Sequence, residues 1–188
     1  RDPEMSRGLG DVYKRQEGNI KVGKSDIFVS EACEYTNSFL HFYPRYSVIL
    51  NVEAEHLDFF KDIQDIRNSF RKFAENTKKD GAIIINGEIE NYTELTSGLD
   101  PQVITFGLND SCDYYPSDIT FDKTACASFT AMHHGTPVMD VKLHVPGMHN
   151  VSNALAAIAL SLDLGISTDA ILAGLSAFGG ADLSLIHI

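Results

Sequence analysis

The chain has 188 residues, of which 44% are hydrophobic, so it is long enough to bury the core of one domain. Its formal net charge of −11 argues against a broad nucleic-acid or anionic-membrane surface, because such surfaces are basic. No apolar run is long enough to span a bilayer, and no secretory signal pattern is present. Cys33, Cys112 and Cys126 lack metal-ligand spacing, so we expect reduced thiols in a cytoplasmic protein, with Cys33 buried as a small hydrophobic residue.

The two ends differ from the body of the sequence. Residues 1–16 are polar and carry no helical or strand period, and residues 183–188 follow Phe178-Gly-Gly-Ala-Asp182 abruptly. Natural disordered termini are one explanation, and non-native sequence flanking a genuine fragment is the other. We favour the second explanation and expect the chain to be part of a larger protein.

Residues 18–25 match the P-loop pattern, a glycine-rich turn whose backbone holds phosphates. A genuine P-loop follows a buried strand and opens a helix. Here polar residues 11–17 precede the match, and residues 26–30, an apolar segment expected to be a strand, follow it. We therefore interpret the match as accidental, and a free-standing P-loop NTPase that uses Lys24 stays an alternative.

Acidic residues and a histidine follow two expected strands. The strand at residues 26–30 ends at Glu31, and the strand at residues 46–52 ends near Glu55, His56 and Asp58. The carboxyl ends of parallel strands meet at one edge of a sheet, where α/β proteins bind ligands. Carboxylates and an imidazole at that edge suit a divalent metal that holds a nucleotide phosphate. A capped helix start beside a surface histidine is the alternative, and we slightly favour the metal site.

Strands and helices alternate through the first half of the body. Apolar residues at helical spacing predict a helix over residues 63–76, with Asp62 as its N-cap. Strands are expected at residues 81–86 and 102–107, with a short helix at residues 91–98 between them. This alternation is typical of βαβ units with a parallel sheet.

The pattern changes to short strands after residue 107. Residues 119–121, 127–131 and 138–145 predict a small antiparallel sheet added to the α/β unit. The segment His133-His-Gly-Thr-Pro137 predicts a turn between two of these strands. Its two histidines could ligate a metal, but adjacent histidines in a turn are more often exposed, and we favour exposure.

A strongly helical stretch opens at Pro146-Gly-Met-His-Asn150 and ends at Gly165, and Ser167 is expected to cap a last helix. Asn150 and Asn153 lie one turn apart on one face of the first of these helices. A carboxamide both donates and accepts hydrogen bonds, which fits the edge of an adenine ring. On spacing alone, Asn150 as an N-cap and Asn153 as a packing residue is an equal alternative.

Three segments occur in the order found in one known family. They are Glu31-Ala-Cys-Glu-Tyr35, Asn51-Val-Glu-Ala-Glu-His-Leu-Asp58 and Pro146-Gly-Met-His-Asn-Val-Ser-Asn-Ala-Leu-Ala-Ala157. Over residues 17–182 the chain resembles the central, ATP-binding domain of the Mur ligase family. The resemblance implies an α/β, P-loop-NTPase-like fold, with a mainly parallel sheet flanked by helices plus a small antiparallel sheet, truncated at both ends.

The segments fit best the family member that joins L-alanine to UDP-N-acetylmuramate in peptidoglycan precursor synthesis. The resemblance implies that ATP phosphorylates the muramoyl carboxylate, after which the amine of alanine displaces phosphate and an amide forms. It also implies that ATP and Mg²⁺ are required and that the other two domains of the same enzyme are partners. The acidic charge of the chain leads us to expect no nucleic-acid or membrane partner.

The resemblance assigns roles to individual residues. Glu31 and His56 match the magnesium-site residues and would be catalytic. Asn150 and Asn153 match the pair that contacts adenine. His149 matches a further contact at the helix start, and Asp58 matches a support for His56. An imidazole is an unusual ligand for Mg²⁺, which prefers oxygen.

The chain also departs from the family pattern. In the family, a glycine-rich P-loop and a UDP-binding domain precede the region that matches residues 17–182, and a segment like Arg-Arg-Phe-Glu follows it. This sequence shows none of these three features at those places. We therefore expect the full-length parent to be an ATP-dependent carbon-nitrogen ligase and this chain alone to be inactive. Two alternatives stay open: a ligase that attaches a tripeptide to the same nucleotide sugar, and a non-catalytic α/β nucleotide-binding or interaction module.

Overall fold

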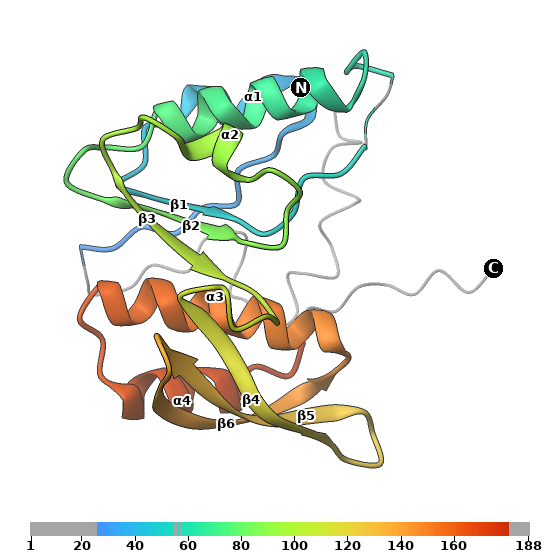
Figure 1. The fold of residues 1–188 in the computed structure, drawn as a ribbon, viewed down its shortest axis with the longest axis vertical. Coiled ribbons are helices and arrows are strands. Elements are labelled where there is room, and N and C mark those ends of the chain that lie inside the picture. The colour runs from blue at the N-terminus through green and yellow to red at the C-terminus, as the bar shows by residue number, and fades with distance from the viewer. Residues whose placement is uncertain (1–25, 55, 57, 181–188) are drawn as a thin grey trace, which may run out of the picture. The chain divides into compact units, whose positions relative to one another are not determined.

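The structure is a computed structural model that describes residues 26–180 except residues 55 and 57 (Figure 1). The chain divides into two units by its internal contacts. Residues 26–31 and 179–180 are the described part of the first unit, and they contain no helix or strand. The second unit, Ala32–Phe178, contains all the elements named below.

The strand expected at residues 26–30 is not formed, so that prediction was wrong. The segment is irregular, and the side chains of Phe28 and Val29 are 82% and 80% exposed. A strand makes no hydrogen bonds within itself, and no strand in the described part of the chain pairs with this segment. The apolar composition indicated burial, but a neighbouring strand is needed to convert such a segment into β-structure.

Apart from a short 3₁₀ segment that was not predicted, the elements of the second unit follow in the predicted order. The first half contains the 3₁₀ segment η3 (Tyr35–His41), β1 (Tyr46–Ile49), α1 (Ile63–Glu75), β2 (Ala82–Asn86), α2 (Thr93–Thr96) and β3 (Gln102–Phe106). The second half contains β4 (Tyr114–Phe121), β5 (Cys126–His133), β6 (Thr136–Pro146), α3 (Met148–Asp163) and α4 (Thr168–Ala177). The alternation predicted for the first half is confirmed, although β1 stops three residues before the end predicted for it.

A six-stranded sheet in the order β1-β2-β3-β4-β5-β6 runs through the described residues. β1, β2 and β3 pair in parallel, whereas β4, β5 and β6 pair antiparallel. The two groups meet at β3 and β4 through one parallel residue pair, Phe106 with Tyr114. The predicted fold class is confirmed, but the antiparallel strands extend the same sheet instead of forming a separate small one.

Side-chain hydrogen bonds reinforce the short join between β3 and β4. The Oδ2 atom of Asp113 accepts hydrogen bonds from the backbone N–H of Thr105 at 2.7 Å and from its hydroxyl at 2.9 Å. The backbone N–H of Asp113 in turn donates to the Thr105 hydroxyl at 2.9 Å. Asp113 therefore supplies bonds that the backbone ladder does not make at this point.

β2 is buried on both faces, as its continuous apolar sequence predicts. Figure 1 shows α1 and α2 over one face of the parallel strands and α3 against the other. Ile83 and Ile85 pack with Phe73 of α1 and with Phe39, whose ring stacks on that of Phe73 at 4.8 Å between centroids. Ile84 belongs to the second core, which α3 covers. The parallel strands are thus enclosed by helices on both sides.

Cap and turn residues lie where the sequence predicts them. The side chains of Asp62 and Ser167 each accept a hydrogen bond from the backbone N–H three residues on, at 2.9 and 3.4 Å, and so cap α1 and α4. Gly165 follows α3 with a φ of 75°. His134 and Gly135 have φ values of 46° and 79°, which a two-residue hairpin turn between β5 and β6 requires.

Within the described residues, no helix is both long and apolar enough to cross a bilayer. The three cysteines are free thiols, as expected. Cys33 is exposed, so the prediction that it is buried was wrong. Cys112 is the buried one, and a Cβ atom at Gly87 or Gly107 would lie within 2.8 Å of its sulfur, so both neighbouring turns need glycine there.

Candidate functional site at the carboxyl ends of the parallel strands

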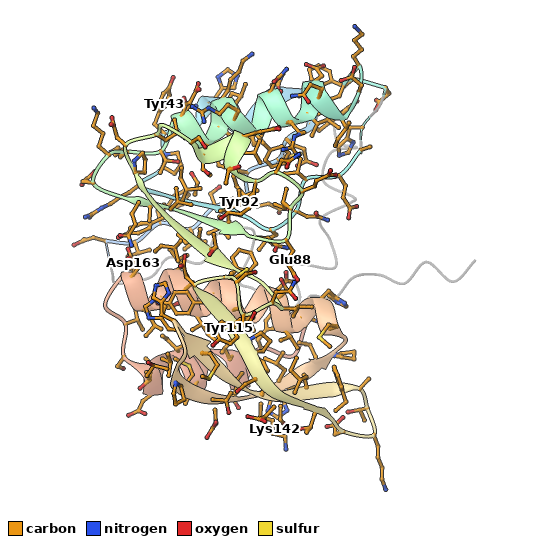
Figure 2. All side chains as sticks on the ribbon, viewed as in Figure 1. Tyr43, Glu88, Tyr92, Tyr115, Lys142 and Asp163 are labelled. Carbon is orange, nitrogen blue, oxygen red and sulfur yellow. The ribbon has the colours of Figure 1, made fainter. Side chains whose placement is uncertain are left out.

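The start of α3 and the carboxyl ends of the parallel strands lie at the same edge of the sheet. Figure 2 shows Glu88, which follows β2, on the opposite side from Asp163, the last residue of α3. α3 therefore begins on the side where β2 ends, and the loop from β1 to α1 lies on that side as well (Figure 1). Ligands of α/β sheets bind at such an edge.

His56 lies in the loop from β1 to α1 and contacts two side chains that come from the start of η3. Its Nε2 atom lies 3.3 Å from Oε1 of Glu34, and its ring centroid lies 4.8 Å from that of Tyr35. The Tyr35 hydroxyl donates a hydrogen bond to Oδ2 of Asp58 at 3.0 Å. These four residues, Glu34, Tyr35, His56 and Asp58, form what we call the His56 cluster. The capped helix of the alternative explanation is also present, because Asp62 caps α1.

The backbone around His56 forms a tight turn. The φ of His56 is 53°, in the left-handed region that costs an L-residue about 1 kcal/mol. Its carbonyl oxygen accepts hydrogen bonds from the backbone N–H groups of Phe59 and Phe60, both at 2.9 Å. The turn thus offsets the strained backbone with two hydrogen bonds and fixes the direction in which the imidazole leaves the loop.

The Tyr35 hydroxyl acts as a hydrogen-bond donor within the His56 cluster. Its hydrogen bond to Asp58, followed by the negative charge of that carboxylate, raises the pKa of Tyr35 above its ordinary value. Tyr35 is therefore protonated throughout the neutral range, and the link to Asp58 persists there.

Glu31 lies in the first unit, at the end of the segment 26–31. Its side chain is exposed, and its carbonyl oxygen accepts a hydrogen bond from the Ser30 hydroxyl at 3.2 Å. The pairing of Glu31 with His56 in a metal site stays a prediction.

Two members of the His56 cluster, Glu34 and Tyr35, were missed by the sequence analysis. Glu34 stands three positions after Glu31 in the same segment, and this second carboxylate was the available signal. Nothing in the sequence marks Tyr35 as a partner, because its hydrogen bond to Asp58 spans 23 residues.

The start of α3 brings the predicted adenine contacts together. The helix begins after Gly147, whose φ is 99° and which makes no side-chain cap. The imidazole of His149 folds back over Gly147, where a Cβ atom would lie 2.7 Å from its Cε1. The Asn150 amide donates to the Pro146 carbonyl at 2.8 Å, and Asn153 is exposed. The alternative of Asn150 as an N-cap and Asn153 as a packing residue was therefore wrong.

The Asn150 side chain keeps the groups that adenine recognition needs. One of its two amide N–H groups is used on the Pro146 carbonyl, which leaves the other N–H and the Oδ1 acceptor for further partners. Because that bond holds the carboxamide against the preceding turn, Asn150 presents a fixed donor and acceptor at the helix start. The exposed Asn153 follows one helical turn later.

His56 and Glu34 are two potential metal donors that the structure brings together. In the part of the chain that the structure describes, no three His, Cys, Asp or Glu side chains converge as a metal site. Mg²⁺ keeps several waters and takes one or two carboxylates together with substrate phosphates. The Glu34 carboxylate beside His56 fits this sparse pattern, with Glu31 as the predicted second carboxylate.

The paired histidines of the β5–β6 turn do not form a metal site with other described residues. The His133 ring stacks on that of Tyr114 at 4.3 Å, and burial, followed by the charge of His134, lowers the pKa of His133. His134 is exposed, as we favoured, and its Nε2 lies 3.6 Å from Oδ1 of Asp113. The same expectation was wrong for His133, which is only partly exposed because it ends β5 and stacks on Tyr114.

Several predictions concern residues outside the described range. They are the P-loop match at residues 18–25 with its Lys24, and the non-native ends expected at residues 1–16 and 183–188. The domain boundaries proposed near residues 17 and 182 lie there as well.

Comparison with known proteins identifies the family. The family profile described as the Mur ligase middle domain matches residues 16–161. The UDP-N-acetylmuramate--L-alanine ligase of Agathobacter rectalis is 61% identical over 181 residues, which cover 96% of this chain and 39% of that protein. The chain thus spans well under half the length of this relative.

Solved structures agree with the sequence comparison. The UDP-N-acetylmuramate-alanine ligase of Thermotoga maritima superposes with a TM-score of 0.64 and 32% identity, over 77% of this chain and 31% of that one. The UDP-N-acetylmuramate:L-alanyl-gamma-D-glutamyl-meso-diaminopimelate ligase from Neisseria meningitides superposes with a TM-score of 0.66 and 26% identity, over 77% of this chain and 43% of that one. The chain therefore belongs to the Mur ligase family, within its middle domain.

Proposed function

We propose that the protein containing this chain joins L-alanine to UDP-N-acetylmuramate at the expense of ATP, as a step of peptidoglycan precursor synthesis in the cytoplasm. The observation that carries the proposal is the 61% identity, over 96% of the chain, with a relative that bears this name. Residues 17–182 would form the ATP-binding domain, and residues 1–16 and 183–188 would lie outside it.

The proposed reaction has two steps. The γ-phosphoryl group of ATP passes to the muramoyl carboxylate and forms an acyl phosphate, with ADP leaving. The amine of alanine then attacks the acyl carbon, the amide bond forms, and inorganic phosphate leaves. Both steps transfer groups between anions, so catalysis depends on positioning and on offsetting negative charge.

The start of α3 is proposed to hold the adenine. Oδ1 of Asn150 would accept a hydrogen bond from the exocyclic amine, while its amide stays on the Pro146 carbonyl. The exposed carboxamide of Asn153 would reach the same base edge from one turn further along, and His149 would contact the nucleotide at the helix start. The fixed orientation of Asn150 supports this role.

His56 and Glu31 are proposed to hold magnesium near the phosphates. Bound there, Mg²⁺ would neutralise charge on the phosphate oxygens. His56 lies in a loop at the sheet edge where α3 also begins, which supports a metal and an adenine contact serving one nucleotide (Figure 1). Glu34, at 3.3 Å from the imidazole, adds negative charge beside it that would attract the cation.

The test is phosphate release by the full-length protein that contains residues 17–182. The assay supplies ATP, Mg²⁺ and UDP-N-acetylmuramate, with and without L-alanine. We expect release that requires both acceptor substrates, and no release from the 188-residue chain alone. His56→Ala should abolish release, whereas Asn153→Ala should raise the KM for ATP about tenfold, the effect of losing one hydrogen bond to the base.

A second candidate is the tripeptide ligase, favoured by the similarity to the Neisseria protein. Release that requires a tripeptide in place of alanine would identify this activity. A folded full-length protein that releases no phosphate with either acceptor would contradict both ligase proposals and favour a binding module.

A further inference from the structure

We propose that Tyr35 is a positioning residue for His56, holding the imidazole in a fixed orientation before any ligand arrives. The role of His56 in metal binding rests on the function proposed above. The bracing of His56 by Tyr35 rests on the His56 cluster alone.

Tyr35 joins two segments that are far apart in the chain. Its ring lies against the imidazole, with 4.8 Å between centroids and 41° between planes. Its hydroxyl is bonded to Asp58, two residues beyond His56 in the same loop. The same ring also packs edge-on with that of Phe59, with 6.1 Å between centroids and 70° between planes. Tyr35 therefore contacts three residues of this loop: His56, Asp58 and Phe59.

The other contact of the imidazole is too weak to fix it alone. The side chains of His56 and Glu34 are 38% and 29% exposed, and ion pairs at such sites contribute little in water. An imidazole on an exposed loop would otherwise rotate among its rotamers. The tyrosine ring blocks one side of it, and the hydroxyl bond to Asp58 keeps that ring in place.

A fixed imidazole lowers the ordering cost of binding. When a side chain already holds its bound orientation, binding a ligand costs less conformational entropy than when binding must first order that side chain. Residues that orient a metal ligand in this way typically change metal affinity by about 10- to 100-fold when they are replaced. Tyr35 would thus affect metal affinity without touching the metal.

The test uses the 188-residue chain with isotope-labelled histidine, observed by NMR. The first readout is the order of the His56 ring, from its relaxation and from the nuclear Overhauser effect between the His56 and Tyr35 rings. The variants are Tyr35→Phe, Asp58→Ala and Asp58→Asn. Tyr43→Phe is the matched control, because it removes the hydroxyl of a 69%-exposed tyrosine nearby in the chain (Figure 2).

Tyr35→Phe and Asp58→Ala should each loosen the His56 ring, and together they should loosen it no further, because both remove the same bond. In Asp58→Asn the carboxamide oxygen can still accept the Tyr35 hydrogen bond, so the His56 ring should stay as ordered as in the original chain. Tyr43→Phe should leave it unchanged. An equally ordered His56 ring in Tyr35→Phe and in the original chain would overturn the proposal.

The second readout is titration with Mn²⁺, a paramagnetic substitute for Mg²⁺ that broadens nearby resonances. We expect the Mn²⁺ midpoint for His56 broadening to rise about tenfold in Tyr35→Phe and to stay unchanged in Tyr43→Phe. His56 resonances in the original chain that do not broaden with Mn²⁺ would contradict the metal role of His56. If the ring order still depends on Tyr35 in that case, the positioning role is supported. A midpoint unchanged by Tyr35→Phe in a chain that does bind Mn²⁺ would contradict the positioning role.

Discussion

At the scale of single residues, the hydroxyl groups of Ser47 and Thr77 form a buried pair. The two oxygens lie 2.6 Å apart, and the residues are 1% and 5% exposed. Each hydroxyl is the other's partner away from water, so removing one leaves the other with an unmade hydrogen bond. Such a loss costs more than removing both groups.

Thr77→Val should therefore lower the free energy of unfolding by about 1–3 kcal/mol, because the Ser47 hydroxyl is left buried without its partner. Urea denaturation measures the change. The double variant Ser47→Ala/Thr77→Val should recover most of the loss. A double variant that is less stable than Thr77→Val would show that the pair does not act as a unit.

Gly81 shows how close two backbones approach at the start of β2. A Cβ atom built there would lie 1.6 Å from the carbonyl oxygen of Arg45, a position that no real atom can occupy. The same oxygen accepts the backbone N–H of Ala82 at 3.2 Å, so it cannot move away without losing that bond.

Gly81→Ala should lower the free energy of unfolding by about 3 kcal/mol, the upper range for an overpacked site. Gly174→Ala is the matched control. Gly174 lies within α4 with nothing within 4 Å of its added Cβ, so alanine should stabilise the chain by about 1 kcal/mol through helix propensity. Thermal denaturation of both variants tests the contrast, and equal effects of the two changes would contradict it.

At the scale of elements, a single carboxylate organises the turn between β4 and β5. Oδ1 of Asp122 accepts hydrogen bonds from the N–H and hydroxyl of Thr124, at 2.8 and 2.7 Å, and from the N–H of Cys126 at 3.0 Å. These bonds, the Thr124 hydroxyl first, lower the pKa of Asp122. The folded pKa lies below the unfolded one, so the stabilisation is present above the unfolded pKa, about 3.9, and is lost as the pH falls through the folded value.

Asp122→Asn keeps an acceptor oxygen but cannot titrate. We expect the urea midpoint of the original chain to fall between pH 6 and pH 3 by more than that of Asp122→Asn, because the variant lacks this proton uptake on unfolding. Lys123 neighbours Asp122 but makes none of these bonds, so Lys123→Gln serves as the charge-change control. Equal falls for the original chain and Asp122→Asn would contradict the assignment.

Elements with local signals were predictable from the sequence, whereas segments that depend on distant partners were not. The apolar period and the Asp62 cap defined α1, because a helix makes its hydrogen bonds within itself. The segment 26–30 carries an equally clear apolar signal but forms no strand, since a strand depends on a neighbour. The length of β1 depends in the same way on its pairing with β2.

The candidate site shows the same division. The sequence segments placed His56 after a strand and Asn150 and Asn153 at a helix start, and the structure has them in those elements. Tyr35 could not be identified as a partner of His56, because their contact depends on how η3 folds against a loop about twenty residues later. Local patterns thus identified residue types at the site, and tertiary packing supplied their supports.

At the scale of the whole second unit, α3 links the two halves of the sheet. It contacts all six strands of the described sheet, parallel and antiparallel alike. Its buried residues, Leu155 and Ile158 among them, belong to the core that also contains Ile84 of β2 and Phe129 of β5. The join between β3 and β4 is short, so the helix is the main connection between the two groups of strands.

Leu155→Ala should lower the free energy of unfolding by about 2–5 kcal/mol, because Leu155 is fully buried. The loss should appear equally in both halves of the sheet. Native-state hydrogen exchange measures it, and we expect the amides of β2 and β5 to lose protection by the same factor. Leu172→Ala, in the partly buried face of α4, is the control and should cost less. Protection lost in one half alone would show that the halves unfold independently.

The strand order has a kinetic consequence. Each strand of the sheet lies beside the strand that precedes it in the chain, from β1 through β6. Contacts of short sequence separation close small loops, and chains rich in them fold quickly. During synthesis, each strand after β1 that emerges from the ribosome meets a partner of the described sheet that has already been made, while α3, the cover for one face, follows all six strands. The nascent sheet therefore grows in the order of translation, with one apolar face exposed until about residue 160, and this interval is when the chain is most prone to aggregate.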